Sequence, residues 1–237
     1  MRSYQLTPRV GLAPGVVDSG LSPAALDAYL FAAKSMTSLI SATNGEGLLG
    51  ARREYRNRKS FDFDPYTCPN AGNLFAASVI ATRVEARNLW SNDFPEDFRA
   101  HTPQGLRYIV GGSFVPHSDD SVKVRIGGAD SAPIRDWVYN MPNRQIASVL
   151  FLNDDFDGGG LQFPNVKDAT GSPLTIKPKA GQVVVFGGDP RYLHAVTEVT
   201  RGERYVMTLW YAPLEILPAE TLAQRKVQFE AAQLGKA

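Results

Sequence analysis

From residue 106 to residue 211 the chain is a succession of short strand-like segments separated by turn residues. The candidate strands cover residues 106–111, 114–117, 146–152, 161–163, 174–177, 182–186, 193–199 and 204–211. Turn signals divide them, including the glycine run at 157–160 and the Gly-Ser-Pro sequence at 171–173. Eight short strands with no helix between them favour a closed barrel or jelly roll over a parallel α/β sheet.

Helical patterns lie on both sides of this strand-rich region. Ser22 is suited to cap a helix and Pro23 to be its first residue, so we expect a helix from there to about residue 40. Further helices are expected at 73–90 and, with an amphipathic pattern, at 218–234. A weak edge strand is expected within residues 4–17. The predicted class is mainly β with flanking helices (α+β).

The size and composition suit one domain. The 237 residues are 43% hydrophobic and 21% charged, which is typical of a globular protein with a substantial core. We therefore expect a single domain over 1–237, with a helical and irregular support region at 1–104, a barrel core at 105–212 and a C-terminal helix at 213–237.

Charge and cysteine content restrict the partners and the compartment. The 25 basic and 24 acidic residues leave a net charge of +1, so nothing favours nucleic acid or a membrane surface as a partner. Cys68 is the only cysteine, which excludes an intramolecular disulfide and a thiolate metal cage. Because we see no secretory signal and no apolar run of membrane-spanning length, a cytoplasmic protein is expected.

Two histidines and one aspartate form a candidate metal site. His117 and Asp119 are two residues apart, so on an extended strand they point the same way. His194 falls in the seventh candidate strand, which we expect to face the second across the barrel. Two imidazoles and one carboxylate form a facial triad, which suits Fe(II) and leaves coordination positions open. Asp120 is expected to face solvent or a neighbouring loop, and His101 to be structural.

Arg204 is the candidate anion-binding residue. Alternation along the last strand places Arg204, Val206, Thr208 and Trp210 on one face. A guanidinium directed into an apolar barrel needs an anionic partner, and its planar fork matches a carboxylate. Thr208 and Tyr108 are candidates to donate further hydrogen bonds to the same carboxylate.

Several of these stretches resemble the Fe(II)/2-oxoglutarate-dependent oxygenases. The spacing of His117, Asp119, His194 and Arg204 is similar to that of their prolyl hydroxylase-like branch, and above all to the prolyl 3-hydroxylase catalytic domain. Further similar stretches are 144–159, 177–181 and 199–204. The resemblance covers roughly residues 105–212.

The resemblance implies a double-stranded β-helix, a jelly-roll or cupin-like barrel, that binds Fe(II) through His117, Asp119 and His194. It also implies 2-oxoglutarate as co-substrate, chelating the metal at one end and held at the other by Arg204. Such enzymes use O2 to convert 2-oxoglutarate to succinate and CO2 while they oxidise an unactivated C–H bond. Ascorbate is a candidate reductant. Asp119 favours hydroxylation, because halogenating relatives lack this carboxylate.

Two other segments are candidates for substrate contact. Residues 123–143 form a long insertion between the second and third candidate strands, and its Trp137 and Tyr139 are candidate substrate-contacting residues. The segment 52–59 has five basic residues in eight positions. It is either a solvated face or a loop at the site mouth that attracts an acidic substrate.

Three functions are compatible with these sequence features. The first is a dioxygenase that acts on a small molecule, such as a free amino acid or a metabolite of specialised biosynthesis. It is preferred because a single cysteine and the lack of a recognisable secretory signal argue against a collagen substrate. The second is a peptidyl-prolyl or other residue hydroxylase, for which an exposed groove beside the metal is expected. The third is a non-catalytic cupin-like module that binds sugars or metal. The oligomeric state is left open.

Overall fold

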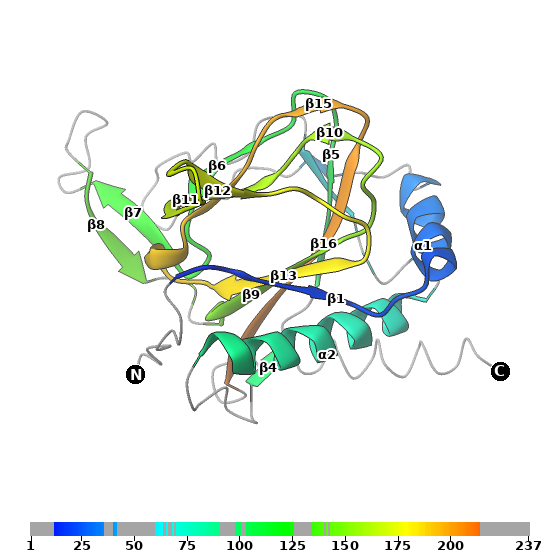
Figure 1. Cartoon of the computed structure of the whole chain (residues 1–237), viewed down its shortest axis with the longest axis horizontal. Helices are drawn as coiled ribbons and strands as arrows, with labels where there is room; N and C mark the ends of the chain where they lie inside the picture. The colour runs from blue at the N-terminus through cyan, green and yellow to red at the C-terminus, as the bar shows by residue number, and fades with distance from the viewer. Residues whose placement is uncertain are drawn as a thin grey trace.

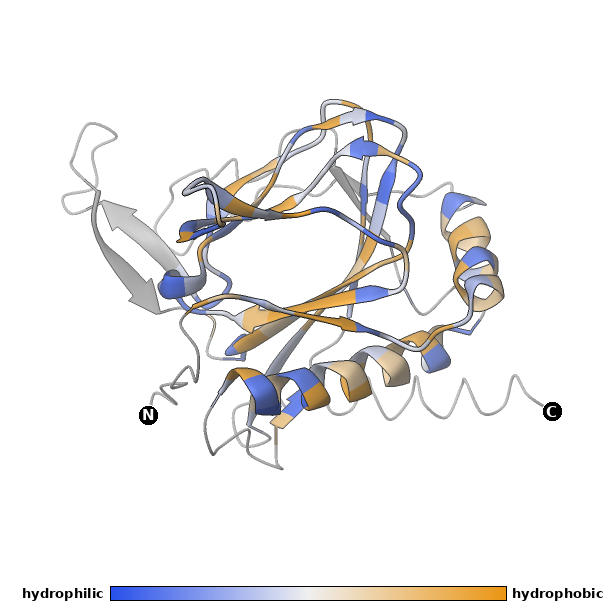
Figure 2. Ribbon diagram, viewed as in Figure 1, coloured by the Kyte–Doolittle hydropathy of each residue, from blue (hydrophilic) through white to orange (hydrophobic). Residues whose placement is uncertain are grey.

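Two antiparallel sheets face each other and enclose the centre of the molecule (Figure 1). The structure is a computed structural model of the chain. It describes residues 12–35, 40–41, 60–63, 65, 68, 70–90, 98–100, 103–125, 134–139, 141 and 143–213. Hydrophobic residues predominate along the strands that line this centre (Figure 2). The mainly β class with flanking helices, predicted from the sequence, is confirmed.

The larger sheet contains eight of the described strands. In spatial order they are β1 (Gly15–Asp18), β13 (Gln182–Gly187), β9 (Ile146–Phe151), β16 (Arg204–Pro213), β5 (Gln104–Tyr108), β3 (Ser60–Phe63) and β2 (Ile40–Ser41), with β4 (Phe98–Ala100) paired to β16. Strands β9, β13 and β16 are buried over almost their whole length, because both faces of this sheet are covered.

The smaller sheet carries the two histidines of interest. In the described part of the chain its order is β12 (Pro173–Ile176), β11 (Leu161–Lys167), β14 (His194–Val196) and β6 (Phe114–His117). The remaining described strands form two separate pairs. Strand β10 (Asp157–Gly158) pairs with β15 (Val199–Arg201), and β7 (Ser121–Arg125) pairs with β8 (Ile134–Tyr139). A short 3-10 helix, η2 (Pro190–Tyr192), leads into β14.

The outer face of the larger sheet packs against helix α2 (Ala71–Leu89) (Figure 1). Tyr211 of β16 shows the contact, because its hydroxyl bonds to Thr82 of the helix (3.0 Å) and to Ser148 of β9 (3.2 Å). Neighbouring residues on these strands point the opposite way, into the barrel. Tyr211 and Ser148 therefore mark the outer face, whereas Trp210 and Ala147 mark the inner one.

Helix α1 (Pro23–Ser35) begins where the sequence predicts. The Ser22 hydroxyl accepts a hydrogen bond from the Ala25 amide (3.3 Å), as expected of an N-cap residue. Tyr29 is fully buried and donates its hydroxyl to the carbonyl of Pro65 (2.9 Å). The helix ends at Ser35, short of the predicted residue 40.

None of the described helices combines the length and apolar character needed to cross a bilayer.

The structure corrects two strand predictions. The insertion at 123–143 is in part a hairpin of β7 and β8, which projects from the barrel (Figure 1). The candidate strand 193–199 is divided, because the chain changes partners there: β14 pairs with β11 and β6, whereas β15 pairs with β10. Three sequence predictions concern segments outside the described residues: the helix at 218–234, the basic segment 52–59 and His101.

A carboxylate at the start of β16 contributes to stability in a pH-dependent way. Glu203 accepts hydrogen bonds from Arg107 Nε (3.1 Å) and the Tyr205 hydroxyl (2.7 Å). Burial acts to raise the pKa of Glu203, but these two donors outweigh it, so the pKa lies below the usual value of 4.5. The stabilisation is therefore complete above about pH 4.5 and is lost as the pH falls through the lowered pKa.

We expect Glu203→Gln to remove part of the acid sensitivity of folding. Because the pair is partly exposed, its contribution should be about 1 kcal/mol or less. Urea unfolding between pH 3 and 7 measures the effect, with the exposed Glu198→Gln as the matched control. Parallel pH profiles for the wild type and Glu203→Gln would contradict this assignment.

Candidate functional site

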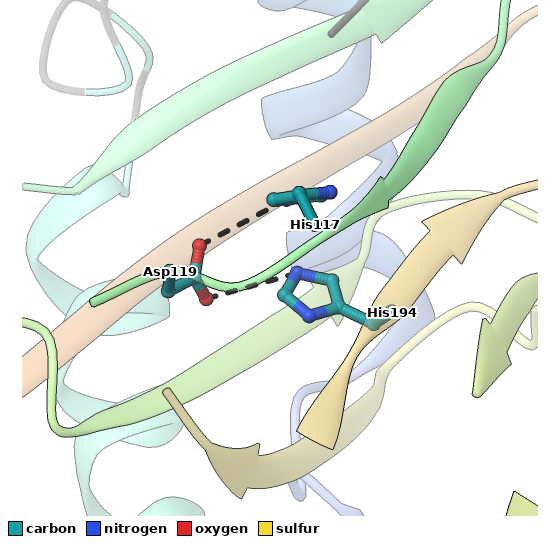
Figure 3. A group of neighbouring side chains, drawn as sticks. All are labelled: His117, Asp119 and His194. Atoms are coloured by element: carbon teal, nitrogen blue, oxygen red, sulfur yellow. Dashed lines mark ion pairs between the residues drawn. The ribbon is translucent and has the colours of Figure 1, made fainter. Parts of the chain in front are cut away.

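His117 and His194 are direct cross-strand neighbours. Strands β6 and β14 are antiparallel, and these two residues are Cα partners in their register. Their ring centroids are 4.2 Å apart (Figure 3). The prediction that their strands face each other across the barrel is therefore wrong. They lie side by side in the smaller sheet, because the chain returns through β14 next to β6.

Asp119 approaches the histidines from a bend after β6, not from a regular strand as predicted. Its Oδ1 lies 4.0 Å from His117 Nε2 and its Oδ2 lies 3.7 Å from His194 Nε2 (Figure 3). One carbonyl, that of Gly188, accepts the backbone amides of Asp119 (2.9 Å) and Asp120 (3.0 Å) and the hydroxyl of Ser118 (2.7 Å). These three bonds hold the bend that turns the carboxylate toward both rings.

Gly188 is a positioning residue that was not predicted from the sequence. A Cβ atom at Gly188 would lie 1.8 Å from the Arg144 carbonyl oxygen, and the Gly188 amide donates to the Gln145 carbonyl (2.8 Å). Only glycine permits this approach of two backbones. The available signal was the glycine pair at 187–188, directly after an apolar strand.

Both imidazoles are held in the tautomer that carries its lone pair on Nε2, the form that binds a metal ion. His117 Nδ1 lies 2.9 Å from the Val115 carbonyl oxygen, and His194 Nδ1 lies 3.1 Å from that of Tyr192. Since a carbonyl can only accept, each Nδ1 carries the proton and each Nε2 keeps its lone pair. The Nε2 atoms are the ones that face Asp119.

Aromatic rings hold the two imidazoles in place. Phe114 stacks on His117, with ring centroids 3.7 Å apart and an angle of 20° between the planes. The ring centroid of Phe186, on the larger sheet, lies 4.5 Å from that of His194. These contacts restrict rotation of the rings and exclude water from one side of the site.

The donor set of this cluster fits a metal ion. Ligand atoms of His117, Asp119 and His194 lie within 4.8 Å of one another. Two ligands bound about 2 Å from one ion are at most about 4 Å apart. The carboxylate–imidazole separations of 4.0 and 3.7 Å meet this limit, each through a different oxygen of Asp119, and the full spread of up to 4.8 Å is slightly wider than it. Asp119 Oδ2 is buried and accepts no hydrogen bond from the described residues. Such a carboxylate is costly to bury unless a cation balances it.

Asp120 is buried, so of the two predicted surroundings, solvent and a neighbouring loop, solvent is wrong. Its carboxylate accepts hydrogen bonds from the hydroxyls of Ser121 (2.6 Å) and Ser118 (3.2 Å), and it is 6% exposed. Burial raises the pKa of Asp120 despite these two donors. The residue therefore supports the bend that carries Asp119.

Arg204 lies inside the barrel among aromatic rings. It is 1% exposed, and its guanidinium carbon is 4.9 Å from the Tyr108 ring centroid and 5.2 Å from that of Phe151. Tyr108 is its Cα partner on β5. Gly159, with a φ of 61°, provides room for the side chain, because a Cβ there would lie 2.9 Å from Arg204 Cδ.

The other predicted site residues, Thr208, Trp137 and Tyr139, lie on β16 and β8. Thr208 is 7% exposed and shares the inner face of β16 with Arg204, about 13 Å further along the strand. Trp137 and Tyr139 lie on β8, and Tyr139 is the Cα partner of Ser121, the residue after Asp120. The backbone of the hairpin is therefore continuous with the bend of the triad.

Comparison with known proteins identifies the barrel. The model of the 2OG-Fe(II) oxygenase superfamily matches residues 103–212. Prolyl 3-hydroxylase 2 of Mus musculus is 40% identical over 68 residues, which are 29% of this chain. The chain spans about a tenth of the length of that relative, since the match covers 10% of it.

Solved structures share the fold. One is a prolyl hydroxylase from Trichoplax adhaerens in complex with a peptide fragment of the hypoxia inducible factor oxygen degradation domain. Its TM-score is 0.56 at 15% identity, over 85% of this chain and 84% of that one. A prolyl-4-hydroxylase from Pseudomonas putida has a TM-score of 0.51 at 22% identity, over 85% and 93% of the two chains. Both are prolyl hydroxylases, whose fold is a double-stranded β-helix.

The predicted double-stranded β-helix and the predicted resemblance are thus both confirmed. The superfamily whose model matches the barrel is one that uses Fe(II), 2-oxoglutarate and O2. Residues 103–212 therefore match the 2OG-Fe(II) oxygenase superfamily by sequence, and the barrel is prolyl hydroxylase-like in fold.

Proposed function

We propose that this protein hydroxylates a prolyl residue within a peptide, with 2-oxoglutarate as co-substrate. The convergence of two imidazole Nε2 atoms and one unbonded carboxylate oxygen is the observation that carries the oxygenase chemistry. The peptide substrate is supported by the relatives, which are prolyl 3-hydroxylases, and by a structural neighbour described in complex with a peptide. A small-molecule substrate, preferred from the sequence, has no such support and stays a prediction, as does ascorbate.

In this proposal His117, His194 and Asp119 hold Fe(II). The bound iron supplies the activation of O2 that the oxidation of a C–H bond requires. The protein supplies the ligand positions: the carbonyls of Val115 and Tyr192 orient the rings through Nδ1, and the Gly188 carbonyl holds the bend of Asp119. Such supporting bonds keep ligands in place before the metal binds.

Arg204 would bind the far carboxylate of 2-oxoglutarate. Because this guanidinium is enclosed by the rings of Tyr108 and Phe151, its interaction with an anion is weakly screened by water. Tyr108 lies beside it, and Thr208 shares its face closer to the middle of β16. The roles of the Tyr108 and Thr208 hydroxyls as further donors to this carboxylate stay predictions.

Removal of a triad side chain should abolish tight metal binding. We expect His117→Ala, His194→Ala and Asp119→Asn each to lower affinity for Mn²⁺, a redox-stable substitute for Fe(II), by at least about 100-fold. Isothermal titration calorimetry measures this directly. Asp27→Asn, at an exposed carboxylate on α1, is the matched control and should bind as the wild type does. A triad variant with wild-type affinity would remove that residue from the site.

Arg204→Met should weaken the use of 2-oxoglutarate without weakening metal binding. Loss of hydrogen bonds to a charged group should raise the KM for 2-oxoglutarate by about 10- to 100-fold. Succinate release at varied 2-oxoglutarate provides the KM, and calorimetry with Mn²⁺ provides the metal affinity. Arg191→Met, which breaks a surface ion pair with Asp189, is the control. An unchanged KM in Arg204→Met would show that the carboxylate binds elsewhere.

The substrate class can be tested with a matched panel. We expect proline-containing peptides to stimulate succinate release several-fold and to gain one oxygen atom by mass spectrometry. Free proline, other amino acids and peptides with alanine in place of proline should have little effect. His117→Ala controls for contaminating activity. Stimulation by a free amino acid, with none by peptides, would instead support the small-molecule function.

A further inference from the structure

The carbonyl that orients His194 belongs to Tyr192, the last residue of the short helix η2. Its oxygen lies 3.1 Å from His194 Nδ1, and Tyr192 as a whole is 2% exposed. A single turn of 3-10 helix contains few backbone hydrogen bonds of its own. The position of this carbonyl therefore depends on what holds the Tyr192 side chain.

The Tyr192 ring fills the place of a missing side chain on the larger sheet. A Cβ atom at Gly187 would lie 2.5 Å from two carbons of the ring. Phe186, the preceding residue of β13, points inward and packs on the His194 ring, so Gly187 is open toward the outer face, where α2 packs. Tyr192 thus extends around the end of β13, with its ring on the outer face and its carbonyl bonded to His194.

Helix α2 supplies a partner for the Tyr192 hydroxyl. Trp90 is the C-cap residue of α2 and is 2% exposed. Its indole Nε1 donates to the Tyr192 hydroxyl (3.1 Å), and the two rings meet edge to face, with centroids 6.3 Å apart. The Trp90 amide donates to the Ala86 carbonyl (3.1 Å), so the residue is fixed to the last turn of the helix. A buried hydrogen bond therefore connects the end of α2 with η2.

We propose that Trp90 and Tyr192 are positioning residues for the metal ligand His194. The Trp90 indole holds the Tyr192 side chain, and the Tyr192 carbonyl in turn holds the imidazole through Nδ1. His117 is oriented in another way, through the carbonyl of Val115, an exposed residue of β6. This inference rests on the proposed metal site, and it adds that the C-terminal end of α2 holds one of the two imidazoles.

The test follows the Nδ1–H protons of both imidazoles by NMR, in Zn²⁺-loaded protein labelled with [15N]histidine. Nuclear Overhauser contacts to Phe186 identify His194, and contacts to the stacked Phe114 identify His117. Tyr192→Phe keeps the ring and loses the hydroxyl. In this variant the His194 Nδ1–H should exchange with solvent about tenfold faster, because its acceptor is less firmly held. The His117 Nδ1–H should exchange at the wild-type rate. An unchanged rate at His194 would overturn the proposal.

Metal affinity gives a second readout, by calorimetry with Mn²⁺. Tyr192→Phe and Trp90→Phe should each weaken binding by about three- to tenfold. This is less than the loss expected for removing a direct partner of a ligand, because the Tyr192 carbonyl itself remains. Since both substitutions break the same hydrogen bond, the double variant should bind no more weakly than Trp90→Phe alone. Losses that multiply in the double variant would show that the two residues act independently, contrary to the proposal.

Tyr211→Phe is the matched control. It also removes a buried tyrosine hydroxyl that bonds to α2, but this hydroxyl lies between the helix and β9 and does not contact η2. It should lower the Tm, as Tyr192→Phe does, and leave the His194 exchange rate and the Mn²⁺ affinity at their wild-type values. If Tyr211→Phe changed exchange and affinity as much as Tyr192→Phe, a general loosening of α2 would explain both and the proposal would be wrong.

The inference and the proposed function fail in different ways. Wild-type protein that binds no Mn²⁺, or that binds it equally well in His194→Ala, would contradict the proposed metal site. If the wild type binds Mn²⁺ through the triad, and Trp90→Phe and Tyr192→Phe keep its affinity and exchange rate, only the role of Trp90 and Tyr192 is contradicted.

Discussion

The Gly188 carbonyl oxygen connects the two sheets at the point on which the site depends. Gly188 follows β13 in the larger sheet, yet its carbonyl accepts three hydrogen bonds from the Ser118–Asp120 bend after β6 in the smaller one. Without those bonds the Asp119 carboxylate would not be directed toward His117 and His194. A Cβ at Gly188 would overlap the Arg144 carbonyl oxygen, so the connection requires glycine.

Around this connection the barrel interior has two chemically different ends. At one end Arg204 is buried among Tyr108 and Phe151, where an anion would be held strongly in an environment with little water. At the other end Trp210 lies on the inner face of β16, and its buried indole nitrogen has no hydrogen-bond partner among the described residues. The imidazoles lie between hydrogen-bonded carbonyls and packed aromatic rings, which fix their direction.

The predictions that failed concern places where the chain changes direction or partner. Residues 193–199 looked like one strand, but β14 and β15 belong to different pairs. The insertion at 123–143 was predicted without strands, whereas 121–125 and 134–139 pair as a hairpin. Asp120 was expected to face solvent or a neighbouring loop, but its carboxylate is buried and accepts hydrogen bonds from the hydroxyls of Ser118 and Ser121. Each outcome depends on a hydrogen-bond partner that local periodicity does not specify.

The sequence alone determined the mainly β class, the start of α1 at Pro23 and the residues that form the His117, Asp119 and His194 cluster. These follow from local pattern, capping and ligand chemistry, which act over a few residues. Only the tertiary structure decided that the two histidines are paired neighbours and that Gly188 holds the bend of Asp119. Such relations arise from the register between strands distant in the chain, where a shift of one residue reverses every side chain.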